Sequence, residues 1–194
     1  MTAKIPVQTL ILAHPNVDFD AFAAMLAAQL LYPGSRICLH GGANRNVREF
    51  FNLHADEIPS VEASAVDPDA VRRLVLVENT DSRRLGPLAG IAERGDVEVI
   101  GFDHHGDGAG ERVVSTDDGS LATSMLRLLL DRGIEITPMH ATALALGIHE
   151  DTGSLTYTST TPRDVDGLAA CLRLGAGQEQ LGRYLRGPLQ PAQR

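Results

Sequence analysis

Short apolar runs alternate with helical patterns along this chain, and that alternation constrains the fold more than any other feature. Four runs predict buried strands, at residues 9–13, 36–40, 73–77 and 97–102. Strands that alternate with helices in this way are typical of a parallel sheet covered by helices. We therefore expect an α/β fold, a three-layer sandwich whose mostly parallel sheet is flanked by helices.

The helical segments carry recognisable start and stop signals. Proline at residue 138 suits the first turn of a helix, and Gly175 suits the position just after a helix ends. The stretch at residues 55–70 and the Gly-rich stretch at 106–110 lack such patterning and predict irregular structure. Helices are predicted at residues 20–31, 46–53, 85–94, 121–130, 138–148 and 162–174.

The length of 194 residues suits one domain with a short appendage, which we place at residues 1–180. From 181 to 194 the sequence turns rich in Pro and Gln, and we expect the start of a linker to a C-terminal domain that this chain does not contain. Cys38 and Cys171 lie far apart in apolar segments, so buried free thiols are favoured over a disulfide.

Charge and hydropathy exclude several classes of function. The formal net charge of −8 argues against a broad basic surface for nucleic acid, although it permits a small phosphorylated substrate or a short oligonucleotide. No apolar run is long enough for a membrane span, so no membrane partner is expected. The N-terminus lacks the pattern of a signal peptide, and we expect a cytoplasmic location.

Acids and histidines gather where the predicted strands end. Because the carboxyl ends of parallel strands meet at one edge of a sheet, these side chains should converge on one cleft. Three strands contribute to this set, and the helix at 138–148 delivers the rest. The set comprises His14, Asp18 and Asp20 after the first strand, Glu78 after the third, Asp103, His104 and His105 after the fourth, and His149, Glu150 and Asp151.

Such a set of acids favours bound metal ions. Unpaired carboxylates would repel one another strongly in a cleft of low dielectric constant, and divalent cations would relieve the repulsion. Carboxylate and imidazole ligands without cysteine favour Mn²⁺, with Mg²⁺, Co²⁺, Fe²⁺ or Zn²⁺ as alternatives. Two such ions held close together can clamp a phosphoryl group and activate a water between them.

Each residue also has a simpler interpretation. Asp18 or Asp20 alone would suit a helix cap, His104 a packed histidine and Glu78 a solvated loop acid, so the case for metal rests on their concentration. His40, His54 and His140 have no acidic cluster beside them in the sequence and are interpreted as structural or surface residues. The role of His149, close to Asp151, stays open.

Four motifs resemble those of the DHH phosphoesterase superfamily, which includes RecJ-type exonucleases. The triplet Asp103-His104-His105 matches the motif that names the family, and the other three motifs lie at residues 14–21, 75–78 and 147–162. The family also contains oligoribonucleases that cleave pAp, cyclic-dinucleotide phosphodiesterases, family II inorganic pyrophosphatases and exopolyphosphatases. The fourth motif and residues 81–86 are most similar to multidomain proteins with CBS domains and a poly(A)-polymerase-like tRNA nucleotidyltransferase, in which a DHH domain comes first.

The resemblance implies a set of ligands for two divalent cations. One cation would be held by His14, Asp18 and Glu78, and the other by Asp20, Glu78, His104 and Asp151. As catalytic residues, His105 would contact the substrate phosphate and Asp103 would hold the histidine pair in place. The family normally has Asp at the bridging position, so Glu78 is a departure. It keeps the charge and adds one methylene.

We therefore expect a two-metal-dependent phosphoesterase that cleaves a phosphodiester or phosphoanhydride on a small nucleotide, a short oligonucleotide or a polyphosphate. Arg83 and Arg84, after the third strand, are candidates for additional phosphate contacts, with a solvated loop pair as the alternative. Two other functions are compatible with the same residues. One is a non-catalytic metal- and nucleotide-binding regulatory module of a larger RNA-processing protein, and the other is a structural metal site.

Overall fold

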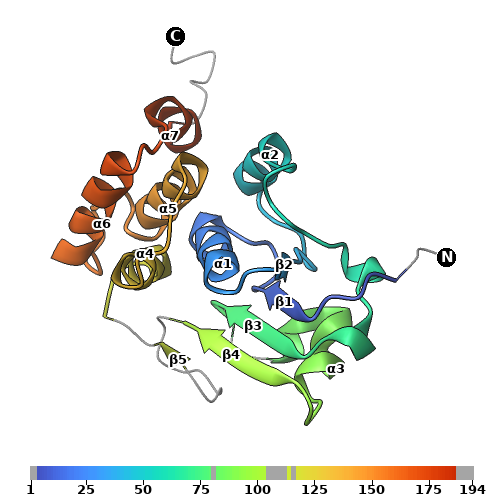
Figure 1. The fold of residues 1–194 in the computed structure, drawn as a ribbon. Helices are drawn as coiled ribbons and strands as arrows, with labels where there is room; N and C mark the ends of the chain where they lie inside the picture. Colours follow the sequence, from blue (N-terminus) through green and yellow to red (C-terminus); the bar gives the residue numbers. More distant parts are fainter. Residues whose placement is uncertain (1–3, 80–81, 104–112, 115–116, 187–194) are drawn as a thin grey trace.

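Five parallel strands form the centre of the computed structural model, which describes residues 4–79, 82–103, 113–114 and 117–186 (Figure 1). The strand order is β2-β1-β3-β4-β5, and β1 pairs in register with β3, with Leu10 opposite Leu74. The predicted α/β class with a parallel sheet is confirmed. The strands are β1 (Thr9–Leu12), β2 (Arg36–Ile37), β3 (Arg73–Val77), β4 (Glu98–Phe102) and β5 (Val113–Val114).

Helices cover both faces of the sheet. Figure 1 shows α1 against one face, with α4 and α5 beyond it, while α3 lies on the opposite face. Short 3-10 helices, η1 (Ala63–Ala65), η2 (Pro68–Ala70) and η3 (Ser82–Leu88), complete the second side. The α-helices are α1 (Phe19–Leu31), α2 (Arg45–Leu53), α3 (Ala89–Ala92), α4 (Leu121–Asp131), α5 (Pro138–Asp151), α6 (Pro162–Arg173) and α7 (Gln178–Leu185).

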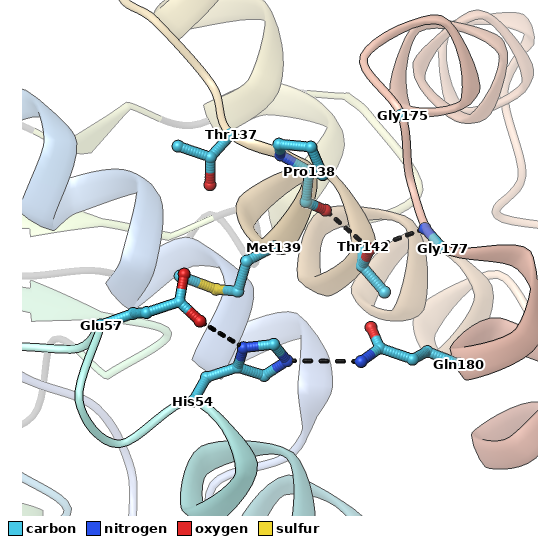
Figure 2. Close-up of a pocket in the computed structure, with 9 residues that line it drawn as sticks. All are labelled: His54, Glu57, Thr137, Pro138, Met139, Thr142, Gly175, Gly177 and Gln180. Carbon is cyan, nitrogen blue, oxygen red and sulfur yellow. Dashed lines mark hydrogen bonds and ion pairs between the residues drawn. The ribbon is translucent and has the colours of Figure 1, made fainter.

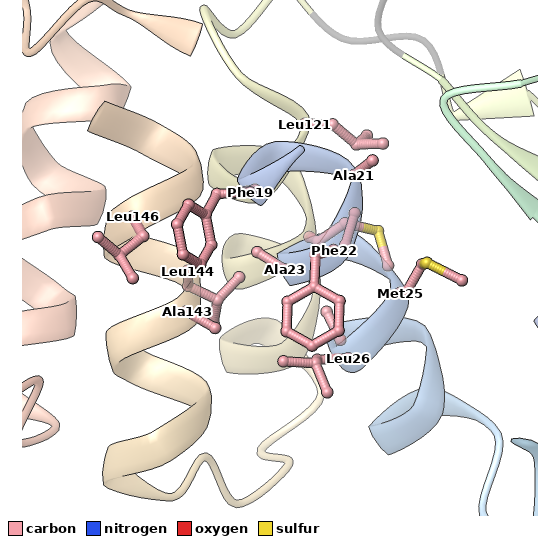
Figure 3. Packing of buried hydrophobic residues seen from close by; sticks show 14 of the residues in the cluster. Phe19, Ala21, Phe22, Ala23, Met25, Leu26, Leu121, Ala143, Leu144 and Leu146 are labelled. Atoms are coloured by element: carbon pink, nitrogen blue, oxygen red, sulfur yellow. The ribbon is translucent and has the colours of Figure 1, made fainter. Parts of the chain in front are cut away.

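Each face of the sheet has its own hydrophobic core. Side chains alternate along a strand, so Ile11 of β1 joins the core under α1 while Leu10 and Leu12 join the core under α3. Helix α1 is buried from Phe19 to Ala28, and its alanines let α4 and α5 approach closely (Figure 3). This packing places the N-terminal end of α1 firmly beside the carboxyl edge of the sheet.

Strand β5 was not predicted, and three predicted segments differ from the structure. The second strand ends at Ile37 rather than at residue 40. The helix predicted at 85–94 is broken at Gly86, which has a φ of 54° and precedes Pro87. A residue before proline is disfavoured in the helical region, so η3 and α3 replace one continuous helix.

The third difference concerns the C-terminal segment. Residues 181–185 are helical rather than the start of a linker, because α7 extends across the predicted boundary at residue 180. Leu181 and Tyr184 are buried in the core under α1, and Tyr184 makes an edge contact with Phe19 at 5.5 Å between ring centroids. The domain limits of 1–180 and 181–194 otherwise stay a prediction.

Two smaller expectations can be compared with the structure. Cys38 and Cys171 are buried free thiols, as predicted, and burial raises the pKa of each to about 12. Among the described helices, none is long and apolar enough to cross a membrane.

Candidate metal centre

The loop after β1 carries His14 and Asp18 to the carboxyl edge of the sheet. Its backbone is anchored to the loop after β2, because Asn16 N–H donates to the Gly41 carbonyl at 3.1 Å and Val17 N–H donates to the Gly42 carbonyl at 3.1 Å. Asp18 is the N-cap of α1 and accepts a hydrogen bond from Ala21 N–H at 3.0 Å. Asp18 therefore does cap the helix, which was the simpler interpretation, and the same side chain also lies close to His14.

Glu78 lies directly after β3 in an uncommon backbone conformation. Its φ is 47°, in the left-handed region, which costs a non-glycine residue roughly 1–2 kcal/mol. Its N–H donates to the Phe102 carbonyl at 2.9 Å, which holds the turn against β4. The left-handed turn at the end of β3 thus places the Glu78 side chain close to Asp18, Asp20 and Asp151.

Glu78 belongs to two groups of ligand atoms. In one group, His14 Nε2 lies 3.5 Å from Glu78 Oε2 and 3.8 Å from Asp18 Oδ2. In the other, Glu78 meets Asp20 and Asp151. Within each group one ligand atom from every residue lies within 4.8 Å of the others. These acidic clusters could hold metal ions, and Glu78 is the side chain common to both.

Asp20 is held at the junction of three helices. Its carboxylate accepts hydrogen bonds from the backbone N–H groups of Leu121 and Ala122 in the first turn of α4, each at 2.8 Å. On the other side, Gly147 of α5 lies so close that a Cβ there would come within 3.0 Å of Asp20 Cα. The side chain is fully buried, so its position depends on α1, α4 and α5 together.

Burial and neighbouring charges shift the pKa values of the acids in the site. Burial raises the pKa of Asp20 well above its usual value, and the charges of Glu78 and Asp151 raise it further. Burial also raises the pKa of Asp18. The hydrogen bond with Glu78 raises the pKa of His14 to about 8, so in the metal-free protein this imidazole carries a proton at neutral pH. A divalent cation would reverse these shifts by compensating the carboxylates directly.

The structure brings together five of the six predicted metal ligands: His14, Asp18, Asp20, Glu78 and Asp151. Their division between the two groups is the one that the motifs implied, although metal binding itself stays a proposal. His104, the sixth, and His105 lie outside the described residues, and the predicted loop at 106–110 lies there too. Asp103 is buried at the end of β4. Arg83 and Arg84 are exposed on η3, outside both groups.

The remaining histidines have individual environments. His149 is half-buried and belongs to neither group of ligand atoms. His40 Nε2 is 2.9 Å from the Ala13 carbonyl oxygen, and His140 Nδ1 is 2.7 Å from Thr137 Oγ1. His54 pairs with Glu57 at 2.8 Å. These contacts fit the structural roles expected for His40, His54 and His140.

Sequence reasoning placed Glu150 in the converging set but did not assign it as a ligand or a catalytic residue, and in the structure it supports the site. Its carboxylate accepts a hydrogen bond from Phe19 N–H at 2.6 Å and so fixes the start of α1. Burial raises its pKa, with further contributions from Asp18, Asp151 and Glu78. Its position beside Asp151 at the end of an apolar helix was the available signal, but a contact with α1 is visible only in the folded chain.

A separate pocket lies at the other end of α5. It has a volume of about 350 Å³ and is bordered by the start of α5, the start of α7 and the residues that follow α2 (Figure 2). Asp151 ends α5, whereas Pro138 begins it, so this pocket is remote from the acidic clusters. It is therefore not part of the candidate metal centre.

Solved structures of other proteins share this fold. Among solved structures, the fold is similar to an exopolyphosphatase-related protein from Bacteroides fragilis, with a TM-score of 0.77 and 16% identity over 95% of this chain and 58% of that chain. It is also similar to a candidate family II inorganic pyrophosphatase from Methanococcus jannaschii, with a TM-score of 0.72 and 18% identity over 92% and 60%. The chain has the same fold as these two phosphatase-related structures. At the level of the fold, the resemblance expected from its motifs is confirmed.

Sequence comparison relates the chain to longer proteins. It is 39% identical over 171 residues to an A-adding tRNA nucleotidyltransferase of Geobacter sulfurreducens, across 86% of this chain and 19% of that protein. It is 30% identical over 190 residues to an A-adding tRNA nucleotidyltransferase of Aquifex aeolicus, across 94% and 21%. The chain thus spans about a fifth of the length of these curated relatives. No protein-family model matches it.

Proposed function

We propose that this chain is a DHH-type domain and a phosphoesterase that depends on two divalent cations. The observation that supports this most is the sharing of Glu78 between the group with His14 and Asp18 and the group with Asp20 and Asp151. A shared carboxylate could hold both cations. When bound, the cations would supply positive charge to a phosphoryl group and lower the pKa of a bound water.

The protein supplies orientation and protonation around that centre. Two backbone N–H groups of α4 fix both oxygens of Asp20, so its carboxylate is aligned before a cation binds. His14 must lose its proton to become a ligand. As the DHH motif implies, we assign His105 to contact the substrate phosphate and Asp103 to hold the histidine pair. We keep Arg83 and Arg84 as candidate phosphate contacts.

The proposed substrate is a phosphodiester or phosphoanhydride on a small nucleotide, a short oligonucleotide or a polyphosphate. Mn²⁺ is the favoured cation because the donors are carboxylates and imidazoles without cysteine, and Mg²⁺ or Co²⁺ are alternatives. The fraction of the relatives that the chain covers supports further domains in the full-length protein. The predicted cytoplasmic location stays a prediction.

One assay tests the proposal. The domain is incubated with Mn²⁺ and, in turn, a short oligonucleotide, pAp, a cyclic dinucleotide, polyphosphate and a generic phosphodiester. Product should form on at least one of them, and Asp20→Ala should abolish it. Thr142→Val serves as the control, because Thr142 is buried at the far end of α5 and its variant should stay active. Full activity of a folded Asp20→Ala variant would refute the proposal.

The second candidate is a non-catalytic module that binds metal and nucleotide within a larger RNA-processing protein. The two sequence relatives favour this second function, since both are tRNA nucleotidyltransferases and most of their length lies outside the region that matches this chain. The same assay separates the two functions. Tight nucleotide binding in Mn²⁺, with no product over hours on any of the five substrates, would favour the module.

A further inference from the structure

We propose that Asp164 of α6 is a positioning residue for Asp20, acting through the first turn of α4; its effect on metal affinity rests on the proposed function. Asp164 is fully buried and lies in neither group of candidate metal ligands. It therefore reaches the site only through other residues. The path runs from Asp164 to the start of α4, and from α4 to Asp20.

The first part of the path is an extended helix cap. Asp164 Oδ2 accepts a hydrogen bond from Thr161 N–H at 2.7 Å, and the Thr161 side chain accepts one from Asp164 N–H, which together form the capping box of α6. Asp164 Oδ2 also accepts from Thr161 Oγ1 at 2.8 Å. A capping box needs only these local partners. Asp164 also accepts from Gly119 N–H at 3.1 Å and from Thr123 Oγ1 at 2.6 Å. One carboxylate thus joins the starts of α6 and α4.

The bonds that Asp164 accepts from Gly119 and Thr123 lie on either side of the N–H groups that donate to Asp20. Gly119 and Thr123 lie on either side of Leu121 and Ala122, whose N–H groups each donate to Asp20 at 2.8 Å. Ser120, the N-cap of α4, accepts from Thr123 N–H at 3.1 Å and ties the turn together. Any movement of this turn must change the direction of the Asp20 carboxylate.

The junction leaves no room for adjustment at Gly119. A Cβ at Gly119 would lie 2.6 Å from Asp164 Oδ2 and 2.9 Å from the Ser159 carbonyl oxygen. The backbone at the start of α4 is therefore in direct contact with the Asp164 carboxylate. This close approach is what lets a side chain of α6 fix a turn that lies far away in the sequence.

The expected effect is on the cation held by Asp20, Glu78 and Asp151. Groups that orient metal ligands from outside the ligand set change metal affinity by roughly 10- to 100-fold when they are removed. Asp164 acts through one more residue, so Asp164→Ala should lower the affinity for this cation by about tenfold. The group formed by His14, Asp18 and Glu78 does not include Asp20, so its affinity for a cation should change much less.

Two readouts test the proposal in the whole chain. Amide hydrogen exchange without metal reports the turn directly, and Mn²⁺ titration by calorimetry reports both cations. Thr142→Val is the matched control, because it also removes a hydrogen bond of a buried side chain, between Thr142 Oγ1 and Gly177 N–H, from the same helical layer (Figure 2). Asp164→Asn should restore most of the wild-type behaviour, since its amide can accept from Thr161 and Gly119 and donate to Thr123 Oγ1.

We expect Asp164→Ala to speed amide exchange at Leu121 and Ala122 relative to the centre of α5. We also expect it to lower the affinity for the Mn²⁺ held by Asp20, Glu78 and Asp151 more than the affinity for the other Mn²⁺. A merely structural residue would lower stability without this local pattern, as Thr142→Val should. Unchanged exchange at Leu121 and Ala122 would overturn the proposal, whatever the metal does. Wild-type protein that fails to bind two Mn²⁺ would refute the proposed function instead, and the exchange data would still decide the role of Asp164.

Discussion

His14 Nε2 and Glu78 Oε2 lie 3.5 Å apart at the carboxyl edge of the sheet, in a contact between the loop after β1 and the turn after β3. Glu78 also belongs to the group with Asp20 and Asp151. The pair therefore links an imidazole to the most buried acid of the site through one shared carboxylate. It also sets the protonation of the metal-free protein, which gives the first prediction.

The pKa of His14 should fall when Glu78 is neutralised. Its value of about 8 depends first on the hydrogen bond with Glu78, so Glu78→Gln should bring it towards 6.5. Because the folded value exceeds the unfolded one, this interaction stabilises the fold fully below about pH 6.5 and is lost as the pH rises through 8. NMR titration of the metal-free proteins measures the shift, and an unchanged pKa in the variant would contradict it.

Gly147→Ala should destabilise the protein and weaken metal binding. In an open helix this change stabilises by roughly 0.5–1 kcal/mol. Here the added methyl would lie 3.0 Å from Asp20 Cα, from the Phe19 carbonyl oxygen and from Ala122 Cβ. Overpacking costs about 1–3 kcal/mol, so the unfavourable term wins. Urea unfolding measures the loss, and Mn²⁺ titration measures the displacement of Asp20.

Gly90→Ala is the matched control for that experiment. Gly90 is exposed in α3, and a Cβ there would meet no atom within 4 Å. Its variant should be unchanged or more stable by roughly 0.5–1 kcal/mol. Equal behaviour of the two variants would show that α1 and α5 are not closely packed at Asp20.

Removal of metal should lower the melting temperature. A cation at 100 times its dissociation constant adds about 2.7 kcal/mol of stability, which corresponds to roughly 5–10 °C for a chain of this size. Thermal unfolding with Mn²⁺, and again after chelation, gives the difference. Because Asp20 is one of the candidate ligands, chelation should change the melting temperature of the Asp20→Ala variant less than that of the wild type. An identical shift in both proteins would exclude Asp20 as a ligand.

Much of the fold could be predicted because its elements carry local signals. The strands at β1, β3 and β4 are apolar runs buried within the sheet, and α5 begins with proline at its first position. Elements that depend on tertiary contacts were missed or misplaced. β2 and β5 are two-residue strands at the sheet edges, and α7 is fixed by burial of Leu181 and Tyr184 rather than by its sequence.

The candidate site divides in a similar way. Position after apolar strands predicted the convergence of His14, Asp18 and Glu78, since parallel strands share one carboxyl edge. The partners of Asp20 could not be predicted in this way. They are backbone N–H groups of Leu121 and Ala122, which have no side-chain signature. The left-handed conformation of Glu78 was equally invisible, because residues that adopt it are usually Gly, Asn or Asp.

The number of Mn²⁺ ions bound per chain tests the account most directly. Calorimetry and electron paramagnetic resonance on the wild type should give two ions close enough for their spins to couple. His14→Ala should lose one ion and Asp20→Ala the other, while Glu78→Ala should weaken both because it belongs to both groups. One ion or none in the wild type, or loss of the same ion in His14→Ala and Asp20→Ala, would contradict the shared two-metal centre.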